Sequence, residues 1–393
     1  MKQIKVRNKA KKQFNQQFPL IHKEDLLVGE TFVPANEFVE FKSEDNQFLG
    51  YGYLGSQNKG FGWVLSFKEK ETITPSLIKQ ILVKAFNRRK HFFSDEQTTA
   101  FRLFNGEGDG FGGMTIDWYQ GFLVISWYND TIYSFKEMLL EQIKSALPEA
   151  KGIYEKRRFK DDSLPESQFV WGEEAQEPLI IKENGVSYAT YLNEGLMTGI
   201  FLDQKEVRGL LGSGLANGKT LLNMFSYTGA FSVAAVSGGA TQTTSVDLAK
   251  RSLEKTQEQF LVNDMDLDQQ RIVVMDVFNY FKYAKKKELS YDVVVLDPPS
   301  FARNKKKTFS VAKDYSKLTT EAVEIIEPHG MLIASTNAAN VSFDRFEKMV
   351  EKGITNGQRR YKPIKQFRLP EDFVVSKHFA EGNYLKVLVY EII

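Results

Sequence analysis

Residues 219–247 read KTLLNMFSYTGAFSVAAVSGGATQTTSVD. The apolar run KTLLNMF leads through a turn containing glycine into an apolar helical segment, and a second strand-like run then ends in an acid. Strand, helix and strand within about 30 residues are typical of a βαβ unit, in which the two strands run parallel. This stretch therefore predicts an α/β fold built on a parallel sheet.

The same alternation continues to the end of the chain. Further strand-like runs are QRIVVMD (270–276), YDVVVLD (291–297), GMLIAST (330–336) and YLKVLVYEI (384–392), and helical patterns occupy 248–264, 277–287 and 316–328. Strands that are apolar throughout are buried on both faces by helices. No full helix lies between the last two strands, so the last one is predicted to be antiparallel. We expect a doubly wound, Rossmann-like α/β domain with a mixed seven-stranded sheet over residues 186–393.

Residues 1–185 show a different pattern of apolar and polar residues. Residues 1–70 contain short alternating runs such as FLGYGYLG and FGWVLSF, which indicate a small β-rich module. Residues 71–185 mix both kinds of element and predict a small α+β module. Its expected parts are a helix over 76–92, a glycine-rich turn NGEGDGFGG (105–113), a β-hairpin over 114–128 and an amphipathic helix over 131–147.

Composition excludes several classes of chemistry. The 393 residues carry a net charge of +2 and contain no cysteine, which rules out disulfides, thiolate metal sites and cysteine nucleophiles. The four histidines show no metal-ligand spacing, so no metal is expected. No apolar run reaches the roughly 18 residues that span a bilayer, and none follows the basic N-terminus. We expect a cytoplasmic protein with no membrane segment.

Acids follow successive strands of the predicted sheet. Gly229 allows a tight turn after the first strand, and Asp247 and Asp276 end the second and third. Ligands of open α/β sheets bind at the carboxyl ends of the strands, where Asp247 could accept the hydroxyls of a ribose and Asp276 an adenine amino group. Either acid could instead cap the helix that follows it, which is worth about 1 kcal/mol.

The fourth strand ends in the sequence Asp297-Pro298-Pro299-Ser300-Phe301. The prolines fix the backbone and remove two N–H donors, and the aromatic ring can stack on a flat substrate. We take Asp297, Pro298, Pro299 and Phe301 as the candidate catalytic group. A turn, two acids and this motif describe a pocket for a carboxylate, a ribose and an adenine. No triphosphate-binding loop occurs, so S-adenosylmethionine is the expected cofactor.

Five motifs resemble a known family: TGIFLDQKEVR (198–208), NMFSYTGAF (223–231), VDLAKRSLE (246–254), MDVF (275–278) and LDPPSFARNK (296–305). The chain is similar to bacterial large-subunit ribosomal RNA methyltransferases that join a PUA-like domain, a central α/β domain and a class I methyltransferase domain. The resemblance implies these domains at 1–70, 71–185 and 186–393. It places at the cofactor Phe201, Asp203, Arg208, Phe225, Tyr227, Thr228, Gly229, Asp247, Leu248, Asp276, Val277 and Asp297, with Arg208 as the partner of the methionine carboxylate.

The resemblance also implies RNA as the partner, either large-subunit ribosomal RNA or a ribosome precursor. Candidate phosphate contacts are Lys2, Lys5, Arg7, Lys9, Lys11 and Lys12 at the N-terminus, Lys156, Arg157, Arg158 and Lys160 beside Tyr154 and Phe159, and the run 303–307. Each run taken alone also fits a solvated surface, and so does 285–287. An exposed β-edge of the central domain could pair two copies as a homodimer.

The missing cysteine bears on the reaction. The nearest characterised group of the family makes 5-methylcytosine, which needs a thiolate to add to carbon 6 first. This chain has no cysteine, and Ser335, Thr336 and Ser342 would be far weaker nucleophiles. We therefore expect direct transfer to guanine N7 or to an exocyclic amine, which needs neither a thiolate nor a metal. Cytosine-5 methylation, a small-molecule or protein substrate, and a non-catalytic RNA-binding role stay open as alternatives.

Overall fold

The structure is a computed structural model of the chain, and it describes all residues except 28, 30–36, 58–59 and 304–307. The chain forms two compact units. The first comprises residues 1–179, 191–198 and 371–382, and the second comprises 180–190, 199–370 and 383–393. No helix of the described part is long and apolar enough to cross a membrane.

The first unit begins with a β-rich region, as expected. Its strands are β1 (Lys2–Val6), β2 (Leu20–Ile21), β3 (Val39–Ser43), β4 (Phe48–Gln57) and β5 (Gly60–Ser66), and its short helices are η1 (Asn8–Ala10), α1 (Lys11–Asn15) and η2 (Lys23–Asp25). The sheet order is β1-β3-β4-β5-β2, with β1 parallel to β3. Alternate residues such as Ile4, Val6 and Phe41 are buried and form its core.

A second sheet follows in the same unit. Its strands β6 (Ala100–Asn105), β7 (Met114–Tyr119), β8 (Phe122–Trp127), β9 (Gly152–Arg157) and β10 (Ser167–Gly172) lie in the order β10-β9-β8-β7-β6. Its helices are α2 (Pro75–Arg88), η3 (Lys90–Ser94), η4 (Gly106–Asp109), α3 (Asp130–Ser134) and α4 (Lys136–Ala146). The predicted hairpin is confirmed as β7–β8. The single helix predicted over 131–147 is wrong: it breaks at Phe135, whose buried ring stacks on Phe38 at 4.4 Å between centroids.

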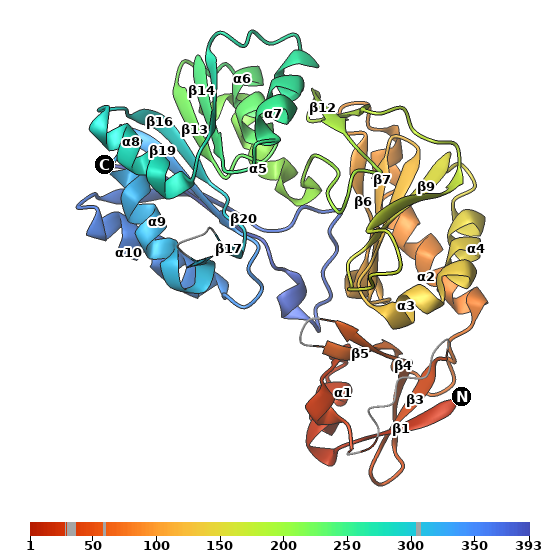
Figure 1. Ribbon diagram of the computed structural model, residues 1–393. Helices are drawn as coiled ribbons and strands as arrows, with labels where there is room; N and C mark the ends of the chain where they lie inside the picture. The colour runs from red at the N-terminus through yellow and green to blue at the C-terminus, as the bar shows by residue number, and fades with distance from the viewer. Residues whose placement is uncertain (28, 30–36, 58–59, 304–307) are drawn as a thin grey trace. The chain divides into compact units, whose positions relative to one another are not determined.

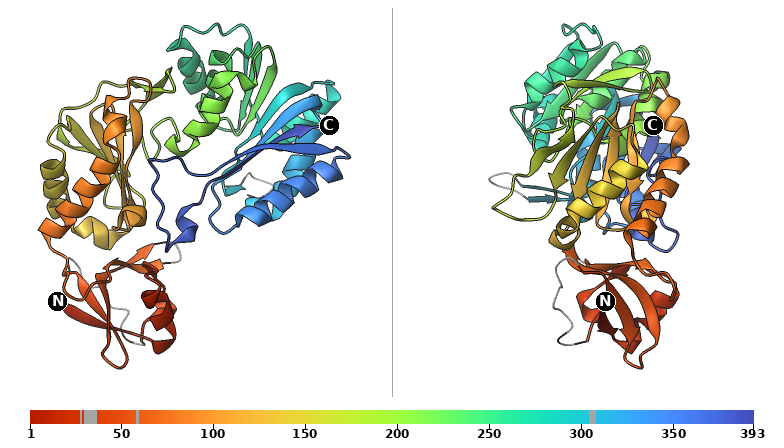
Figure 2. Two further views of the ribbon diagram at one scale, coloured as in Figure 1. Left: turned by 180° about the vertical axis from the view of Figure 1, so that it is seen from behind. Right: turned by 90° about the vertical axis from the view of Figure 1, so that its right-hand side faces the viewer.

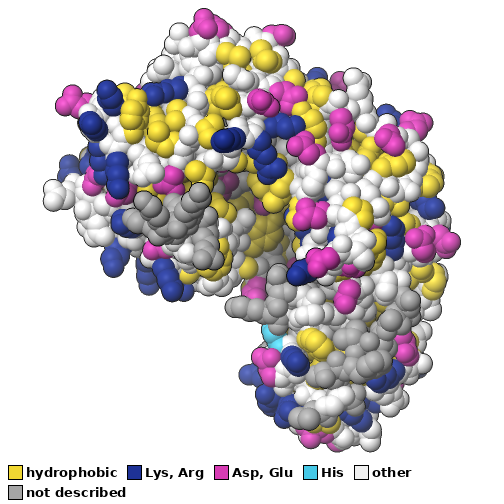
Figure 3. Space-filling model, in the orientation of Figure 1, with side chains coloured by type: hydrophobic (Ala, Val, Ile, Leu, Met, Phe, Trp, Pro, Cys, Tyr) yellow, Lys and Arg dark blue, Asp and Glu magenta, His cyan; other side chains and the backbone are white. Residues whose placement is uncertain are grey.

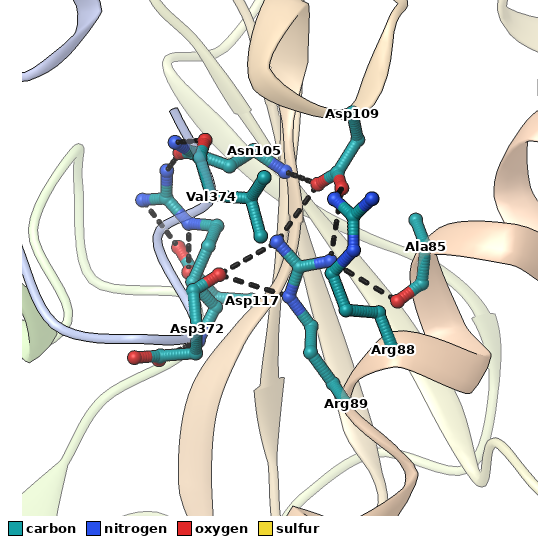
Figure 4. Close-up of polar contacts among 9 residues, drawn as sticks. Ala85, Arg88, Arg89, Asn105, Asp109, Asp117, Asp372 and Val374 are labelled. Carbon is teal, nitrogen blue, oxygen red and sulfur yellow. Dashed lines mark hydrogen bonds and ion pairs between the residues drawn. The ribbon is translucent and has the colours of Figure 1, made fainter. Parts of the chain in front are cut away.

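The glycine-rich turn holds a segment that is distant in sequence. Residues 371–382, with η7 (Ala380–Gly382), pack against it (Figure 4). The Arg89 guanidinium donates to the Asp372 carbonyl at 2.6 and 2.9 Å. A Cβ on Gly108 would lie 1.8 Å from the Val374 carbonyl oxygen, so this approach requires glycine. The turn thus packs against the loop that joins the last two strands of the chain.

The second unit has the predicted α/β fold. Its main sheet contains β13 (Thr220–Met224), β14 (Gln242–Asp247), β15 (Gln270–Val274), β16 (Tyr291–Leu296), β19 (Ile326–Thr336), β20 (Tyr361–Phe367) and β21 (Lys386–Ile392). Its helices are η5 (Leu202–Gln204), α5 (Lys205–Leu210), η6 (Leu211–Leu215), α6 (Ala230–Ser237), α7 (Ser252–Leu261), α8 (Val277–Lys286), α9 (Val311–Val323) and α10 (Phe343–Asn356). Two small ladders accompany them: β11 (Leu179–Glu183) with β12 (Val186–Thr190), and β17 (Phe301–Arg303) with β18 (Thr308–Ser310).

The seven strands lie in the order β15-β14-β13-β16-β19-β21-β20, and β21 is antiparallel to both of its neighbours, as predicted. Helices α8, α9 and α10 cover one face of the sheet, and α5 and α6 cover the other (Figure 1). The helix predicted over 316–328 is misplaced. Helix α9 spans Val311–Val323, and the buried Ile326 is already the first residue of strand β19, so the chain leaves the helix before it. The result is a doubly wound α/β fold with a mixed sheet.

Candidate active site

The predicted site residues of the second unit gather at one edge of its sheet. Strands β13, β14, β15 and β16 are parallel, so their carboxyl ends meet at the same edge. The chain order reverses between β13 and β16, and such a reversal is where open α/β sheets bind their ligands. The turn after β13, Asp247 after β14, Asp276 after β15 and Asp297 after β16 all lie there.

The turn after β13 has an unusual backbone. Phe225 and Tyr227 adopt left-handed conformations, with φ of 61° and 52°, and Gly229 follows with φ of 79°. For residues other than glycine this conformation costs of order 1–3 kcal/mol each and persists where surrounding contacts enforce it. The Tyr227 amide donates to Asp247 Oδ2 at 2.9 Å, which is one such contact. The Asp247 carboxylate thus helps to hold the turn after β13, which lies at the candidate cofactor site.

Asp247 fits a ribose better than it fits a helix cap. Its Oδ1 accepts from the Ala249 amide at 2.8 Å, whereas α7 begins later, at Ser252. The alternative that Asp247 caps this helix is therefore wrong. Two acceptor positions of about four on a carboxylate are used, which leaves room for two hydroxyl donors. The next residue, Leu248, is 56% exposed and offers an apolar surface beside the acid.

Asp276 does cap the following helix, because its side chain accepts from the Asn279 amide at 3.1 Å at the start of α8. A carboxylate has more acceptor positions than the single one that a helix cap uses. Val277 is buried in the core, so its side chain packs against the protein. Since the side chain is buried, only the backbone of Val277 is predicted to contact the cofactor.

The segment 199–204 is bound to the strained turn. The Gly199 amide donates to Tyr227 Oη at 3.2 Å, and Thr228 Oγ1 donates to the Gly199 carbonyl at 2.7 Å. Phe201 is 42% exposed, with its ring 5.4 Å from that of Tyr227 between centroids. Two segments far apart in sequence thus present aromatic rings together, as the resemblance implies.

The structure gives Arg208 a partner other than the predicted methionine carboxylate. Its guanidinium is buried and makes a two-point ion pair with Glu183 of β11, at 2.6 and 2.7 Å. The same group donates to the Phe201 carbonyl at 2.7 Å. Arg208 therefore positions the Phe201 segment. Sequence reasoning missed Glu183, since a lone acid in the run LIIKE carries no signal of its distant partner.

Removal of the Glu183 charge should destabilise the protein. In the variant Glu183→Gln the buried Arg208 cation loses its counter-charge, and unfolding in urea should show a loss of about 3 kcal/mol. The double variant Glu183→Gln/Arg208→Met should recover much of that loss, because no uncompensated charge is then buried. Equal stability of Glu183→Gln and the wild type would contradict this account of the pair.

Asp297 lies in a polar network that the sequence did not indicate. Gln204 Nε2 donates to Asp297 Oδ1 at 3.1 Å and to Ser335 Oγ at 2.7 Å. The pKa of Asp297 is raised to about 6, chiefly by burial and also by the nearby Asp203, against the opposing effects of the bond from Ser335, the charge of Arg208 and the bond from Gln204. Such a carboxyl exchanges its proton near neutral pH, as a catalytic acid or base must.

Gln204 is buried, and its Oε1 has no hydrogen-bond partner in the described part of the chain. Buried polar atoms are almost always paired, so this oxygen marks a position that protein groups alone do not satisfy. It lies on the side chain that contacts Asp297. An orphaned acceptor of this kind fits a site that is completed by a ligand.

The Asp-Pro-Pro motif orients an exposed aromatic residue. Pro298 is buried and Pro299 is exposed, and the chain then enters the β17–β18 ladder, in which Phe301 pairs with Ser310. Phe301 is 66% exposed. An exposed ring four residues after Asp297 can stack on a flat base.

The basic residues predicted to contact phosphates differ in their exposure. The prediction is wrong for Lys156 and Arg157, which are buried. Lys156 Nζ donates to the Gly195 carbonyl and to Ser167, and Arg157 donates to backbone carbonyls of the segment 159–165. Arg158 and Lys160 remain exposed. Residues 304–307 lie outside the described part of the chain.

Basic side chains gather on another surface of the second unit. In Figure 3, several Lys and Arg side chains lie among hydrophobic, acidic and other residues on the part of the surface that carries α8, α9 and α10. In the run 285–287, however, Lys285 forms ion pairs with Glu321 and Glu324 of α9, which fits a charged helix end. No cluster of potential metal ligands occurs among the described residues.

Fold and site together define a doubly wound α/β protein with a nucleotide-type ligand site at its switch point. The model of the S-adenosylmethionine-dependent methyltransferases matches residues 101–356, and that of a PUA-like domain matches residues 4–67. The chain belongs to this family of S-adenosylmethionine-dependent methyltransferases, and it is an enzyme that uses S-adenosylmethionine.

Several relatives are similar over nearly their full length. YwbD of Bacillus subtilis, provisionally assigned as a ribosomal RNA large subunit methyltransferase, is 49% identical over 377 residues, which is 95% of each chain. The ribosomal RNA large subunit methyltransferase I of Yersinia pseudotuberculosis is 30% identical over 366 residues, covering 92% of this chain and 90% of the relative.

Solved structures agree with the fold. A crystal structure of a provisionally assigned methyltransferase in complex with S-adenosylhomocysteine has a TM-score of 0.92 and 44% identity, and each chain is covered completely. A second such protein, from Streptococcus mutans, has a TM-score of 0.91 and 43% identity over the same coverage.

The residues at the edge of the sheet fit this cofactor. Asp247 keeps acceptor capacity for a ribose, Asp276 follows the neighbouring strand at the same edge, and Leu248 and Phe201 expose apolar surface. Exposed apolar side chains beside a few polar groups are typical of a small-molecule site.

Proposed function

We propose that the protein methylates a base of large-subunit ribosomal RNA by direct transfer to a nitrogen. The observation that carries the proposal is a half-buried carboxyl of raised pKa, Asp297, close in sequence to an exposed aromatic, Phe301, in a chain without cysteine. The names of the relatives support ribosomal RNA as the substrate, and the PUA-like match supports RNA binding by residues 1–70. In this proposal the domains are 1–70, 71–185 and 186–393.

The chemistry fits a nitrogen acceptor. S-adenosylmethionine, when bound, supplies a methyl group activated by a sulfonium centre. Guanine N7 already has a lone pair, and the ionised Asp297 balances the positive charge that the methylated ring acquires. For an exocyclic amine, Asp297 accepts the proton that the nitrogen releases. In both cases Pro298 and Pro299 fix the carboxyl and Phe301 stacks on the base.

The alternative of cytosine-5 methylation is disfavoured by the residue at the expected nucleophile position. Ser335, at the end of β19, is buried, accepts from Gln204 and bonds to Asp297. A buried hydroxyl in a polar network is a much poorer nucleophile than a thiolate. Ser335 is better described as a group that holds Asp297.

The test is mass spectrometry of ribosomal RNA nucleosides from cells with and without the gene. We expect loss of 7-methylguanosine or of an N-methylated base from the large-subunit RNA, and its return when the gene is restored. Loss of 5-methylcytosine would contradict direct transfer to nitrogen, and unchanged RNA would contradict a ribosomal substrate. Restoration with the Asp297→Asn variant is the matched control for catalysis.

A further inference from the structure

A groove on the first unit has no role in the site described above. It has a volume of about 1010 Å³ and is lined by η3, by the β7–β8 turn and by residues 149–151. A second hollow of about 470 Å³ runs along the exposed side of α2, and Asn87 lines both. The two hollows are here together called the α2 groove, and helix α2 packs against α4 (Figure 2).

Aromatic rings form part of its wall. After α2 ends, η3 places Phe92 and Phe93 over the adjoining strands β6 and β7. Phe93 packs edge-on against Trp118 at 4.9 Å between centroids, and Phe92 stacks on Phe101 at 5.1 Å. Phe92, Phe93 and Trp118 are half-buried, so each keeps part of its surface in the groove. Partly exposed rings held rigidly by neighbours are suited to stacking on unpaired bases.

The charge along the groove is positive. Four lysines line it, and they are Lys79, Lys84, Lys90 and Lys151, against the two carboxylates Asp95 and Glu149. The Asp95 carboxylate accepts from the amides of Gln97 and Thr98 at 2.8 and 3.2 Å, so it serves its own loop. Lysines along a track attract a phosphate backbone without reading its sequence.

We propose that the α2 groove binds a single-stranded stretch of RNA. Unpaired bases stack on Phe93 and Trp118, and Lys84, Lys90 and Lys151 contact the phosphates. Aromatic rings flanked by lysines favour a single strand over a duplex, whose bases are already stacked on one another. The inference rests on the proposed function, because an enzyme that methylates a base of ribosomal RNA needs surfaces that bind RNA.

The first test measures binding by the full chain. The probe is a fluorescein-labelled oligouridylate of roughly 12 nucleotides, within the usual range of single-strand site sizes. The variant Lys84→Glu/Lys90→Glu should bind at least ~10-fold more weakly, and its plot of log affinity against log salt should be shallower by about 1.4. The control Lys352→Glu/Lys377→Glu changes two exposed lysines that lie outside the groove and outside residues 1–70, and it should bind as the wild type does.

The second test reports on stacking. Trp63 and Trp127 are buried, whereas Trp171 is exposed, so the background Trp171→Phe leaves Trp118 as the partly exposed tryptophan. Its emission should be quenched when oligouridylate is added. Phe93→Leu, which keeps an apolar side chain, should weaken binding about 10-fold with unchanged thermal stability.

Wild-type affinity and salt slope in the lysine variant would overturn the inference, and so would equal affinity for a fully paired hairpin RNA. Failure of the proposed function has a different signature. In that case the wild type would transfer no methyl group to unmodified ribosomal RNA, whatever its affinity for oligouridylate.

Discussion

The variant Asp297→Asn is expected to lose methyl transfer by about 10³-fold, within the range that general acid–base groups contribute. The amide keeps the size of the side chain and can still accept from Gln204, but it can neither take a proton nor balance a positive charge. Initial rates with saturating RNA and cofactor measure this loss. Asp292→Asn is the matched control, because Asp292 lies at the opposite end of the same strand and accepts from Thr220.

The same variant should be more stable than the wild type. The pKa of Asp297 is raised to about 6, chiefly by burial, so folding favours its protonated form. The associated stability is present below the ordinary pKa of an aspartate and is lost as the pH rises through about 6. At pH 7.5 the asparagine removes a buried charge, and we expect a gain of about 1–2 kcal/mol after allowance for partial exposure.

The pH dependence of kcat/KM tests the role of Asp297 independently. The wild-type kcat/KM should rise with pH through an apparent pKa of about 6, where Asp297 becomes ionised. The residual activity of Asp297→Asn should lack this limb. A less stable Asp297→Asn protein with a wild-type pH profile would show that the carboxyl is structural.

The second large effect is expected at Asp247. Asp247→Ala removes the acceptor of the Tyr227 and Ala249 amides and the proposed acceptor of the ribose hydroxyls. The strained turn after β13 then loses a contact that holds it, and cofactor affinity should fall at least ~100-fold, since bonds to charged groups contribute about 1.5–3 kcal/mol each. Calorimetry with S-adenosylhomocysteine measures the loss.

Asp266→Ala is the matched control for this variant. Asp266 accepts from the amide of Asp268 at 2.9 Å, two residues on, just as Asp247 accepts from that of Ala249. Asp266→Ala should therefore lose a similar hydrogen bond within a local turn, while its affinity for S-adenosylhomocysteine stays unchanged. A fall in affinity of the same size in both variants would show that the effect of Asp247 is local folding alone.

Most of the fold follows from the sequence. Apolar strand runs, their turns and their order are local signals, and hydrophobic burial acts on them wherever the strands pair. The strand ends carrying Asp247, Asp276 and Asp297 could therefore be assigned to one edge of a sheet before any coordinate was known. The helix errors arose where packing decided the boundary: Phe135 stacks on the distant Phe38, and the chain after Val323 joins the sheet at Ile326.

The pairing of charges could not be predicted in this way. The spacing of Arg208 and its motif indicated a ligand, but Glu183 from a separate hairpin takes its guanidinium. Lys156 and Arg157 look like a basic run, yet strand β9 turns both into the protein, where carbonyl oxygens accept from them. Gln204 and Ser335 gave no sequence signal as partners of Asp297.

The sequence by itself thus determined the α/β class, the edge of the sheet at which Asp247, Asp276 and Asp297 gather and the absence of a thiolate nucleophile, because these depend on residue type and local order. The tertiary structure alone decided which ionic groups are neutralised, which carboxyl has a raised pKa, and where rings and lysines line a common groove. Those properties depend on burial and on contacts between segments distant in the chain. Both arise only when the whole chain has packed.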